Sequence, residues 1–178
     1  MNKLHTYKGF TLIELMVTLA VLAILISLAA PSLNDFQERV ELTGAAEKVY
    51  GHIQYARSES ISNGSDIYIA FKGTGAAGWC MGISDTAACD CSSAASLALC
   101  TINSAPARYV TGSDYPSVEL STNLTSDDSG FLSPRSTSME NGTITLNYPG
   151  YGDAKVVLST IGRVRLCSDT LDIYAGCP

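Results

Sequence analysis

A short polar leader that ends at a glycine and passes straight into a long apolar segment is the strongest constraint on this chain. Phe10 follows Gly9, and residues 10–30 read FTLIELMVTLAVLAILISLAA. These 21 residues are enough to span a bilayer core of roughly 30 Å. They carry one charged side chain, Glu14. A carboxylate deep in a bilayer costs about 2.5–3.5 kcal/mol on insertion scales, so Glu14 needs a partner or a function.

Three interpretations of this segment compete. A cleaved secretory signal has an apolar core of about 7–15 residues, which is shorter than the segment seen here. A plain signal anchor explains the length and the preceding Lys3 and Lys8 but leaves Glu14 unexplained. In the third interpretation the leader is cut after Gly9. Phe10 then gains a cationic amine four positions before Glu14, and such an amine on the same or a neighbouring chain neutralises the carboxylate.

The charge distribution sets the orientation and limits the partners. Lys3 and Lys8 precede the apolar segment, so the positive-inside rule keeps the N-terminus cytoplasmic and sends the rest outward. The 178 residues carry a net charge of −6, and loss of the two leader lysines leaves nine basic against 17 acidic residues, or −8. An acidic surface excludes broad attraction to nucleic acid or anionic lipid. Such binding requires a local basic patch.

The motif G-F-T-L-I-E-L at residues 9–15 resembles the class III signal of type IV pilins and type II secretion pseudopilins. The resemblance implies cleavage between Gly9 and Phe10 by a prepilin peptidase, followed by N-methylation of Phe10. It implies that Glu14 guides docking of the subunit into a helical filament. It also implies a single-pass protein of the bacterial inner membrane, with a periplasmic C-terminal domain, that later enters a pilus or pseudopilus.

The apolar run ends at Pro31 and an amphipathic pattern follows. Apolar residues recur at helical spacing at Leu33, Phe36, Val40, Val49, Ile53 and Ala56. Asn63-Gly64 is a plausible helix stop. The pattern is compatible with one long helix from Phe10 to about Ser62, or with two helices broken at Pro31. The predicted organisation is a leader at 1–9, a transmembrane half-helix at 10–31, an amphipathic half at 32–63 and a β-rich domain at 64–178.

After Gly64 the apolar period changes from helical to two, which is typical of strands separated by turn residues. Six strands are expected, at Asp66–Phe71, Gly78–Ile83, Ser117–Leu120, Gly142–Tyr148, Lys155–Leu158 and Arg163–Cys167. Hairpin links favour antiparallel sheets. The predicted fold class is therefore α+β of the type IV pilin kind, a long N-terminal helix packed on an antiparallel sheet.

All six cysteines lie downstream of the apolar segment, at positions 80, 89, 91, 100, 167 and 177. An even number in the part beyond a membrane indicates disulfides formed in an oxidising compartment. Buried thiols or a metal site are the alternatives, but Cys89-x-Cys91 is not a zinc-type C-x-x-C and His52 is remote. We expect Cys89, Cys91 and Cys100 to tie down a loop at 84–106 near Cys80. Cys89 and Cys91 are too close to bond each other. Cys167 and Cys177 are expected to close a C-terminal loop. The other pairings stay open.

The order of shorter motifs narrows the family. Residues 55–60 (YARSES) close the helix, and GWC at 78–80, CDC at 89–91, GFLSPR at 130–135 and GRVRLC at 162–167 follow. Together they resemble the GspH/FimT group, which comprises FimT- and FimU-type minor pilins and pseudopilin H of type II secretion. One departure is Ser136, where the family pattern leads us to expect a glycine.

The residues give no catalytic constellation, so we expect a protein that is not an enzyme and has no cofactor and no metal. His5 lies in the leader and His52 stands alone on the helix, where a histidine is usually structural or solvated. The sequence contains neither H-E-x-x-H nor G-x-S-x-G. Residues 73–78 fit G-x-G-x-x-G, but they precede a strand instead of opening a helix, which argues against a nucleotide site.

The candidate binding element is Gly162-Arg163-Val164-Arg165. In a strand, residues two apart share a face, so Arg163 and Arg165 would project together roughly 6–7 Å apart while Val164 and Leu166 face the core. Paired guanidiniums suit phosphate oxygens. In FimT-type minor pilins a G-R-x-R element is associated with DNA capture during natural transformation, so the resemblance implies DNA as a partner. Alternatively the two arginines pair with Asp or Glu across the sheet.

Arg135 and Lys155 would widen the basic patch if they lay beside it. The leading functional hypothesis is a minor pilin of the type IV pilus, at or near its tip, that helps to initiate assembly. Its expected partners are other pilins, the prepilin peptidase, the inner membrane and, in the binding interpretation, DNA. The alternative is a pseudopilin of a type II secretion system, which shares the fold and the signal.

Overall fold

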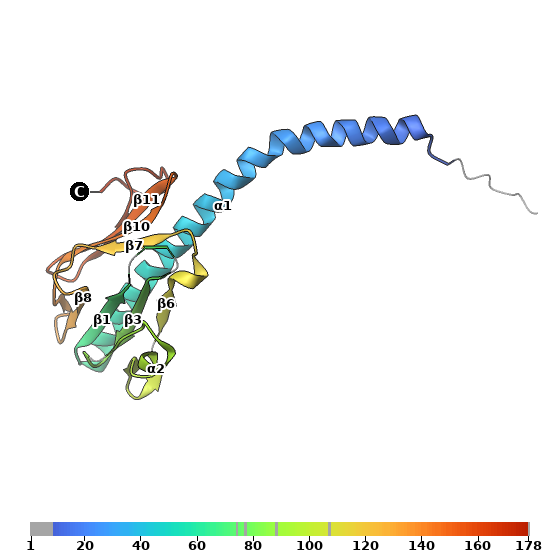
Figure 1. Ribbon diagram of the computed structural model, residues 1–178. Helices are drawn as coiled ribbons and strands as arrows, with labels where there is room; N and C mark the ends of the chain where they lie inside the picture. Colours follow the sequence, from blue (N-terminus) through green and yellow to red (C-terminus); the bar gives the residue numbers. More distant parts are fainter. Residues whose placement is uncertain (1–8, 74, 77, 88, 107, 178) are drawn as a thin grey trace, which may run out of the picture. The chain divides into compact units, whose positions relative to one another are not determined.

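The computed structural model describes residues 9–177 apart from 74, 77, 88 and 107 (Figure 1). The predicted leader lies outside the described residues except for Gly9. The chain divides into two compact units, Met1–Gln37 and Glu38–Pro178. The helix α1, Leu12–Asn63, extends through both and continues past Pro31. Of the two alternatives left open by the sequence, the single helix is the one observed.

In the first unit the described large apolar side chains of α1 are exposed, from 77% at Leu12 down to 51% at Val21 and Leu22. Phe10, just before the helix, is 87% exposed. Among the described residues, no helix combines the length and the apolar character needed to cross a bilayer.

In the second unit one face of α1 is buried. Six residues of that face have no exposed surface: Leu42, Ala45, Ala46, Val49, Ile53 and Ala56. The predicted stripe is therefore correct for Val49, Ile53 and Ala56. It is wrong for Leu33, Phe36 and Val40, which are 58%, 63% and 51% exposed. The hydrophobic core includes no described residue of α1 before Leu42.

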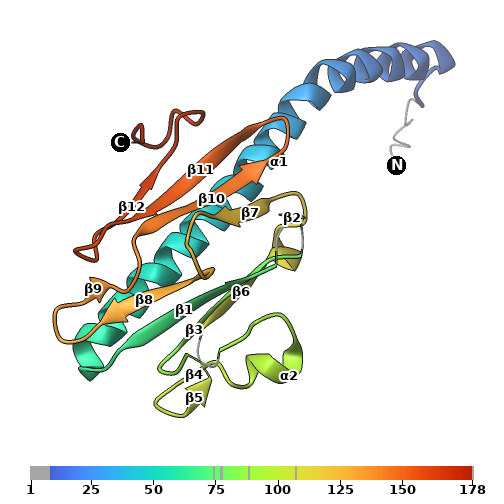
Figure 2. The same cartoon turned by 60° about the vertical axis from the view of Figure 1, so that its left-hand side comes forward.

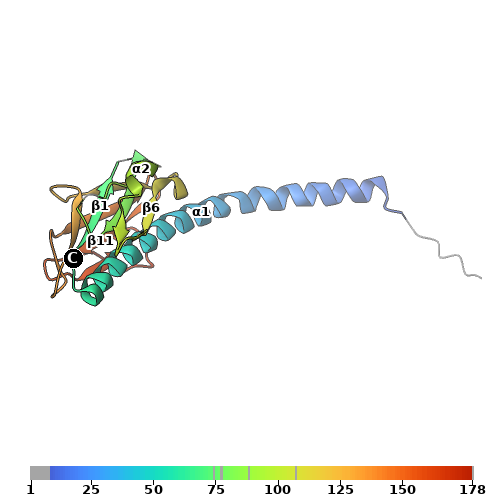
Figure 3. The ribbon, with the colours of Figure 1, turned by 90° about the horizontal axis from the view of Figure 1, so that it is seen from below.

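Two five-stranded antiparallel sheets form the rest of the core. The first sheet has the order β6-β3-β1-β8-β9, with bounds Tyr109–Thr111, Cys80–Ser84, Ile67–Lys72, Asp128–Leu132 and Thr137–Ser138. The second sheet has the order β12-β11-β10-β7-β2, with bounds Val164–Cys167, Gly152–Leu158, Gly142–Tyr148, Glu119–Thr122 and Gly75–Ala76. Both sheets lie along the second half of α1 (Figure 2), and Figure 3 shows that helix running beside the strands. This α+β architecture confirms the predicted fold class.

Smaller elements fill the connections. They are the helix α2 (Ala94–Leu97), the hairpin of β4 (Thr101–Ile102) and β5 (Ala105–Pro106), and the 3-10 turn η1 (Gly112–Asp114). All six expected strands are present, β10 with the predicted bounds and the others with shifted ends, whereas β2, β4, β5, β6, β8 and β9 were not expected. The strand β8 reads DSGFL, and its central glycine interrupts the alternation of apolar and polar residues from which strands were predicted. Gly130 is needed because a Cβ there would lie 2.2 Å from the carbonyl oxygen of Ile67.

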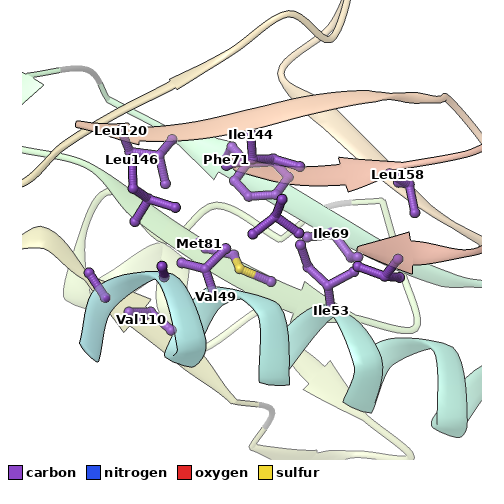
Figure 4. Packing of buried hydrophobic residues seen from close by; sticks show 14 of the residues in the cluster. Val49, Ile53, Ile69, Phe71, Met81, Val110, Leu120, Ile144, Leu146 and Leu158 are labelled. Carbon is purple, nitrogen blue, oxygen red and sulfur yellow. The ribbon is translucent and has the colours of Figure 1, made fainter. Parts of the chain in front are cut away.

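The core lies where α1 meets both sheets. Val49 and Ile53 of the helix point toward Ile69 and Met81 of the first sheet and toward Ile144 of the second (Figure 4). Burial alternates along the long strands of the second sheet: in β11, Ala154, Val156 and Leu158 are buried and the residues between them are only partly buried. This alternation is what a strand with one face on a core produces. The outward side of the second sheet is therefore left for polar side chains.

The disulfide-linked loop covers the outer side of the first sheet. Cys80 bonds Cys91, and Cys89 bonds Cys100. Both bonds lie against Gly82, where an added Cβ would be 2.6 Å from Sγ of Cys89 and 3.2 Å from Sγ of Cys100. The third bond, Cys167–Cys177, closes the C-terminal loop as expected. Cross-links over loops of this length contribute roughly 2–4 kcal/mol each.

We predict that Gly82→Ala lowers the free energy of unfolding by about 1–3 kcal/mol, because the new methyl group overpacks the two disulfides. The measurement is urea unfolding under oxidising conditions. The control is Gly51→Ala, at an exposed position of α1 where a Cβ meets nothing within 4 Å. This change should stabilise by about 0.5–1 kcal/mol. Equal effects of the two substitutions would contradict the packing described for Gly82.

Candidate phosphate-binding turn

The candidate site is the tight turn that joins β11 to β12. The amide of Gly162 donates to the carbonyl of Ser159 at 2.8 Å, which closes the turn. The amide of Ser159 donates to the carbonyl of Arg163 at 3.0 Å, and the amide of Arg163 donates to Oγ of Ser159 at 3.1 Å. The strand β12 then continues in register, with Arg165 opposite Val157. Backbone pairing thus fixes the direction of both arginines.

Both arginine side chains are directed to solvent. Arg163 and Arg165 are exposed, whereas Val164 between them is 6% exposed and belongs to the core. Leu166 is half-buried and packs against the same core. Within the part of the chain that the structure describes, neither guanidinium has a carboxylate within 4.0 Å. The alternative in which they pair with Asp or Glu across the sheet is therefore absent there.

A shallow groove of about 410 Å³ runs between the turn and the sheet. Its lining combines aliphatic, hydroxyl and guanidinium groups, from Val157, Ser159, Thr160, Ile161, Arg163 and Arg165. The groove can hold an apolar group beside an anion, and both arginines border it.

Lys155 does not widen the basic patch of Arg163 and Arg165, because its charge is paired with two carboxylates. Its Nζ lies 3.1 Å from Oδ2 of Asp153 and 3.1 Å from Oδ2 of Asp169. Hydrogen bonds to Asp153 and then to Asp169 raise the pKa of Lys155. In return, the amide of Cys177 and then Lys155 lower the pKa of Asp169. Lys155 therefore serves to hold the C-terminal loop on β11.

Arg135 is exposed and lies on a turn that touches the candidate site. The next residue, Ser136, presents its carbonyl oxygen to Gly162, so that a Cβ on Gly162 would lie 1.9 Å from it. The amide of Ser138 also donates to the carbonyl of Thr160 at 3.2 Å. The contact brings the backbone of Arg135 next to the turn that carries Arg163, a relation the sequence did not reveal.

Ser136 has φ +51°, in the left-handed region that favours glycine. This explains why the sequence pattern led us to expect a glycine there. The side chain is 1% exposed, and its Oγ donates to the carbonyl of Arg57 at 3.4 Å. A serine at position 136 in place of the expected glycine therefore keeps the same turn, with some backbone strain.

The second group of predicted site residues lies at the start of α1. Thr11 and Glu14 form a reciprocal cap: the amide of Glu14 donates to Oγ1 of Thr11 at 3.3 Å, and the amide of Thr11 donates to Oε2 of Glu14 at 3.4 Å. This is the S/T-x-x-E capping box, a local signal that our sequence reasoning overlooked at Thr11. Gly9 and Phe10 precede the helix with exposed backbone and side chains.

His52 is a buried residue of α1, 8% exposed, and its Nδ1 lies 2.8 Å from the carbonyl oxygen of Lys48. Burial lowers the pKa of His52; the hydrogen bond to the Lys48 carbonyl opposes this shift, and the charges of Lys48 and Arg108 add to it. The histidine is therefore a packed group of the helix. Among the described residues, no cluster of three His, Cys, Asp or Glu side chains could hold a metal ion.

Comparison with known proteins gives two family matches. The model of the type II transport protein GspH matches residues 45–169, and the prokaryotic N-terminal methylation motif matches residues 4–30. Two fimbrial proteins of Pseudomonas aeruginosa are each 38% identical over 60 residues. Those matches span 34% of this chain and only 38% of each relative.

Among solved structures, the type IV minor pilin FimU of Pseudomonas aeruginosa PAO1 is similar with a TM-score of 0.53 and 25% identity. The similarity covers 74% of this chain and 91% of FimU. A second crystal form of FimU gives a TM-score of 0.51 at 23% identity, over 70% of this chain and 91% of that one.

We predict that Gly162→Ala destabilises the domain by about 2–4 kcal/mol, because φ is +77° and the new Cβ meets the carbonyl of Ser136. Gly150→Ala is the matched control: φ is +87°, but a Cβ there meets nothing within 4 Å. It should cost about 1 kcal/mol, from backbone strain alone. Thermal unfolding of both variants measures the difference, and equal losses would refute the contact between the two turns.

Proposed function

Because this chain belongs to the family of the type II transport protein GspH, we propose that it is a minor pilin of the type IV pilus. In this proposal it is a structural subunit at or near the pilus tip that helps to initiate assembly, and it has no catalytic role. The observation that carries the proposal is the arrangement of the two family matches, an N-terminal methylation motif at 4–30 followed by a GspH-type domain at 45–169.

The proposed processing follows from the N-terminal residues. A prepilin peptidase removes residues 1–9 by cutting between Gly9 and Phe10, and Phe10 is then N-methylated. Residues 10–31 act as the transmembrane half of the helix in the inner membrane, residues 32–63 form the amphipathic half, and residues 64–178 form the periplasmic domain.

Glu14 is the proposed assembly residue. Its contact with the Thr11 amide, at 3.4 Å, is long for a hydrogen bond. The carboxylate is therefore available to a stronger partner, such as the free amine of Phe10 on a neighbouring subunit. The uncovered Leu33, Phe36 and Val40 are apolar surface that packing against other pilins would bury.

A second binding function is proposed for the turn after β11. Arg163 and Arg165 are exposed, and the described residues offer them no carboxylate. Two free guanidiniums next to a groove suit adjacent phosphates of DNA. Since the whole chain carries a net charge of −6, such binding is local and weak. In this proposal it serves DNA capture during natural transformation.

The alternative is a pseudopilin of a type II secretion system. The match to the model of the type II transport protein GspH favours it, whereas the similarity to the minor pilin FimU favours the pilus. The genes that neighbour this one discriminate between the two, because the fold and the signal are shared.

For processing and assembly, we predict that Gly9→Leu leaves the precursor uncut, because a bulky residue blocks the peptidase site. Glu14→Ala should permit cleavage but reduce the amount of protein in sheared pili about tenfold or more. Immunoblots of membranes and sheared filaments measure both outcomes. Glu59→Ala, a half-buried carboxylate near the other end of α1, is the control. Normal cleavage of Gly9→Leu would rule out the prepilin interpretation.

For DNA, we predict that the double variant Arg163→Gln, Arg165→Gln loses most of its affinity for a short duplex. Binding of the unaltered chain should weaken with salt at a logarithmic slope of about −2, for about two phosphate contacts. Fluorescence anisotropy of the full chain in uncharged detergent measures both. Lys48→Gln, which removes an exposed positive charge from α1, should change the affinity little. An affinity unaffected by the double change would contradict the assignment.

A further inference from the structure

The candidate turn carries an exposed aliphatic side chain that neither the core nor phosphate binding explains. Ile161 is 71% exposed, more than any other large apolar side chain described in residues 38–178. It immediately precedes Gly162 and lines the same groove as Arg163 and Arg165. Exposing an isoleucine of this size gains nothing for folding.

The turn holds Ile161 in a fixed position. Gly162 closes the turn onto Ser159, and Ser138 braces it from the side. Oγ of Ser138 donates to the carbonyl of Ser159 at 2.8 Å, and its amide donates to the carbonyl of Thr160 at 3.2 Å. The backbone of Gly162 also packs against the carbonyl of Ser136. Ile161 is thus presented at the tip of a supported turn.

We propose that Ile161 is a wedge that inserts between base pairs of duplex DNA from the minor groove, while Arg163 and Arg165 hold the flanking phosphates. This inference rests on the proposed DNA binding of the same turn. Proteins that bind the minor groove often combine arginine contacts with an apolar side chain that unstacks a base step and bends the duplex. The arginines supply affinity, and the wedge supplies the preference among DNA substrates.

The lining of the groove favours a duplex over a single strand. Proteins that bind single strands stack bases on aromatic rings, and the side chains that line this groove include none. The same lining lacks the Asn, Gln, Asp and Glu side chains that read adenine and cytosine edges in the major groove. Selectivity then comes from how easily a base step opens, which favours TA steps over G·C-rich sequence.

The test uses the full chain in uncharged detergent with three probes of equal length: a duplex rich in TA steps, a G·C duplex and a single strand. The unaltered chain should bind the TA-rich duplex about tenfold more tightly than the other two. Ile161→Ala should remove that advantage without weakening binding to the G·C duplex. Ile161→Leu should retain it, because the wedge keeps its size. The control Ile173→Ala alters an exposed isoleucine of the C-terminal loop, 43% exposed, and should change nothing.

A second measurement reports the wedge directly. The fluorescence of 2-aminopurine at a TA step should rise on binding, because the step unstacks, and the rise should vanish with Ile161→Ala. Suppose that only the arginine changes reduce affinity, and that Ile161→Ala retains the TA preference and the fluorescence rise. The wedge is then refuted, whereas DNA binding by the arginines stands. Preference for the single strand also refutes it. If the unaltered chain binds none of the three probes, both the wedge and the DNA-binding function fail.

Discussion

Burial of one face of α1 against two antiparallel sheets is the interaction on which the rest of the domain depends. The buried face alternates bulky and small residues, and its alanines at 45, 46 and 56 have no exposed surface. Small residues let strands approach the helix closely, while Val49 and Ile53 reach into both sheets (Figure 4). Neither sheet has another helix of comparable length to cover it among the described residues. Without α1 the apolar faces of both sheets would be open to water.

The end of that helix also organises the candidate site. Oγ of Ser60 donates to the carbonyl of Phe131 in β8 at 3.4 Å, and the carbonyl of Arg57 accepts from Ser136 at 3.4 Å. Ser136 in turn touches Gly162. A chain of contacts therefore runs from the helix through the 133–136 turn to the turn that bears the arginines. The left-handed backbone of Ser136 is the strained point in this chain of contacts, and its buried side chain helps to hold it.

Much of this arrangement follows from local patterns in the sequence. The apolar period of two located six strands, because each keeps one face on the core. The even set of cysteines beyond the apolar segment indicated disulfides, but spacing alone left the pairing of Cys80 and Cys89 open. Where two cysteines meet depends on how the loop crosses β3 over Gly82, which is a long-range property. Strands as short as β9 have too few residues to show any period.

The site was foreseen in part. Alternation along β12 correctly set the direction of Arg163 and Arg165. The ion pairs of Lys155 with Asp153 and Asp169 depend on cross-strand register and on the C-terminal loop, so the sequence could not separate a free cation from a neutralised one. The helical stripe misplaced Leu33, Phe36 and Val40 because periodicity identifies an apolar face but not what covers it.

The most direct test of the proposal that one braced turn of this domain binds DNA is hydrogen–deuterium exchange of the full chain with and without a short duplex. We expect added protection in peptides that cover residues 157–166 and 133–138, because the two turns are in contact and form one surface. The disulfide-linked loop at 84–106 should exchange equally in both states. Protection that appears in that loop, or none at the two turns under conditions where the duplex is bound, would contradict the assignment.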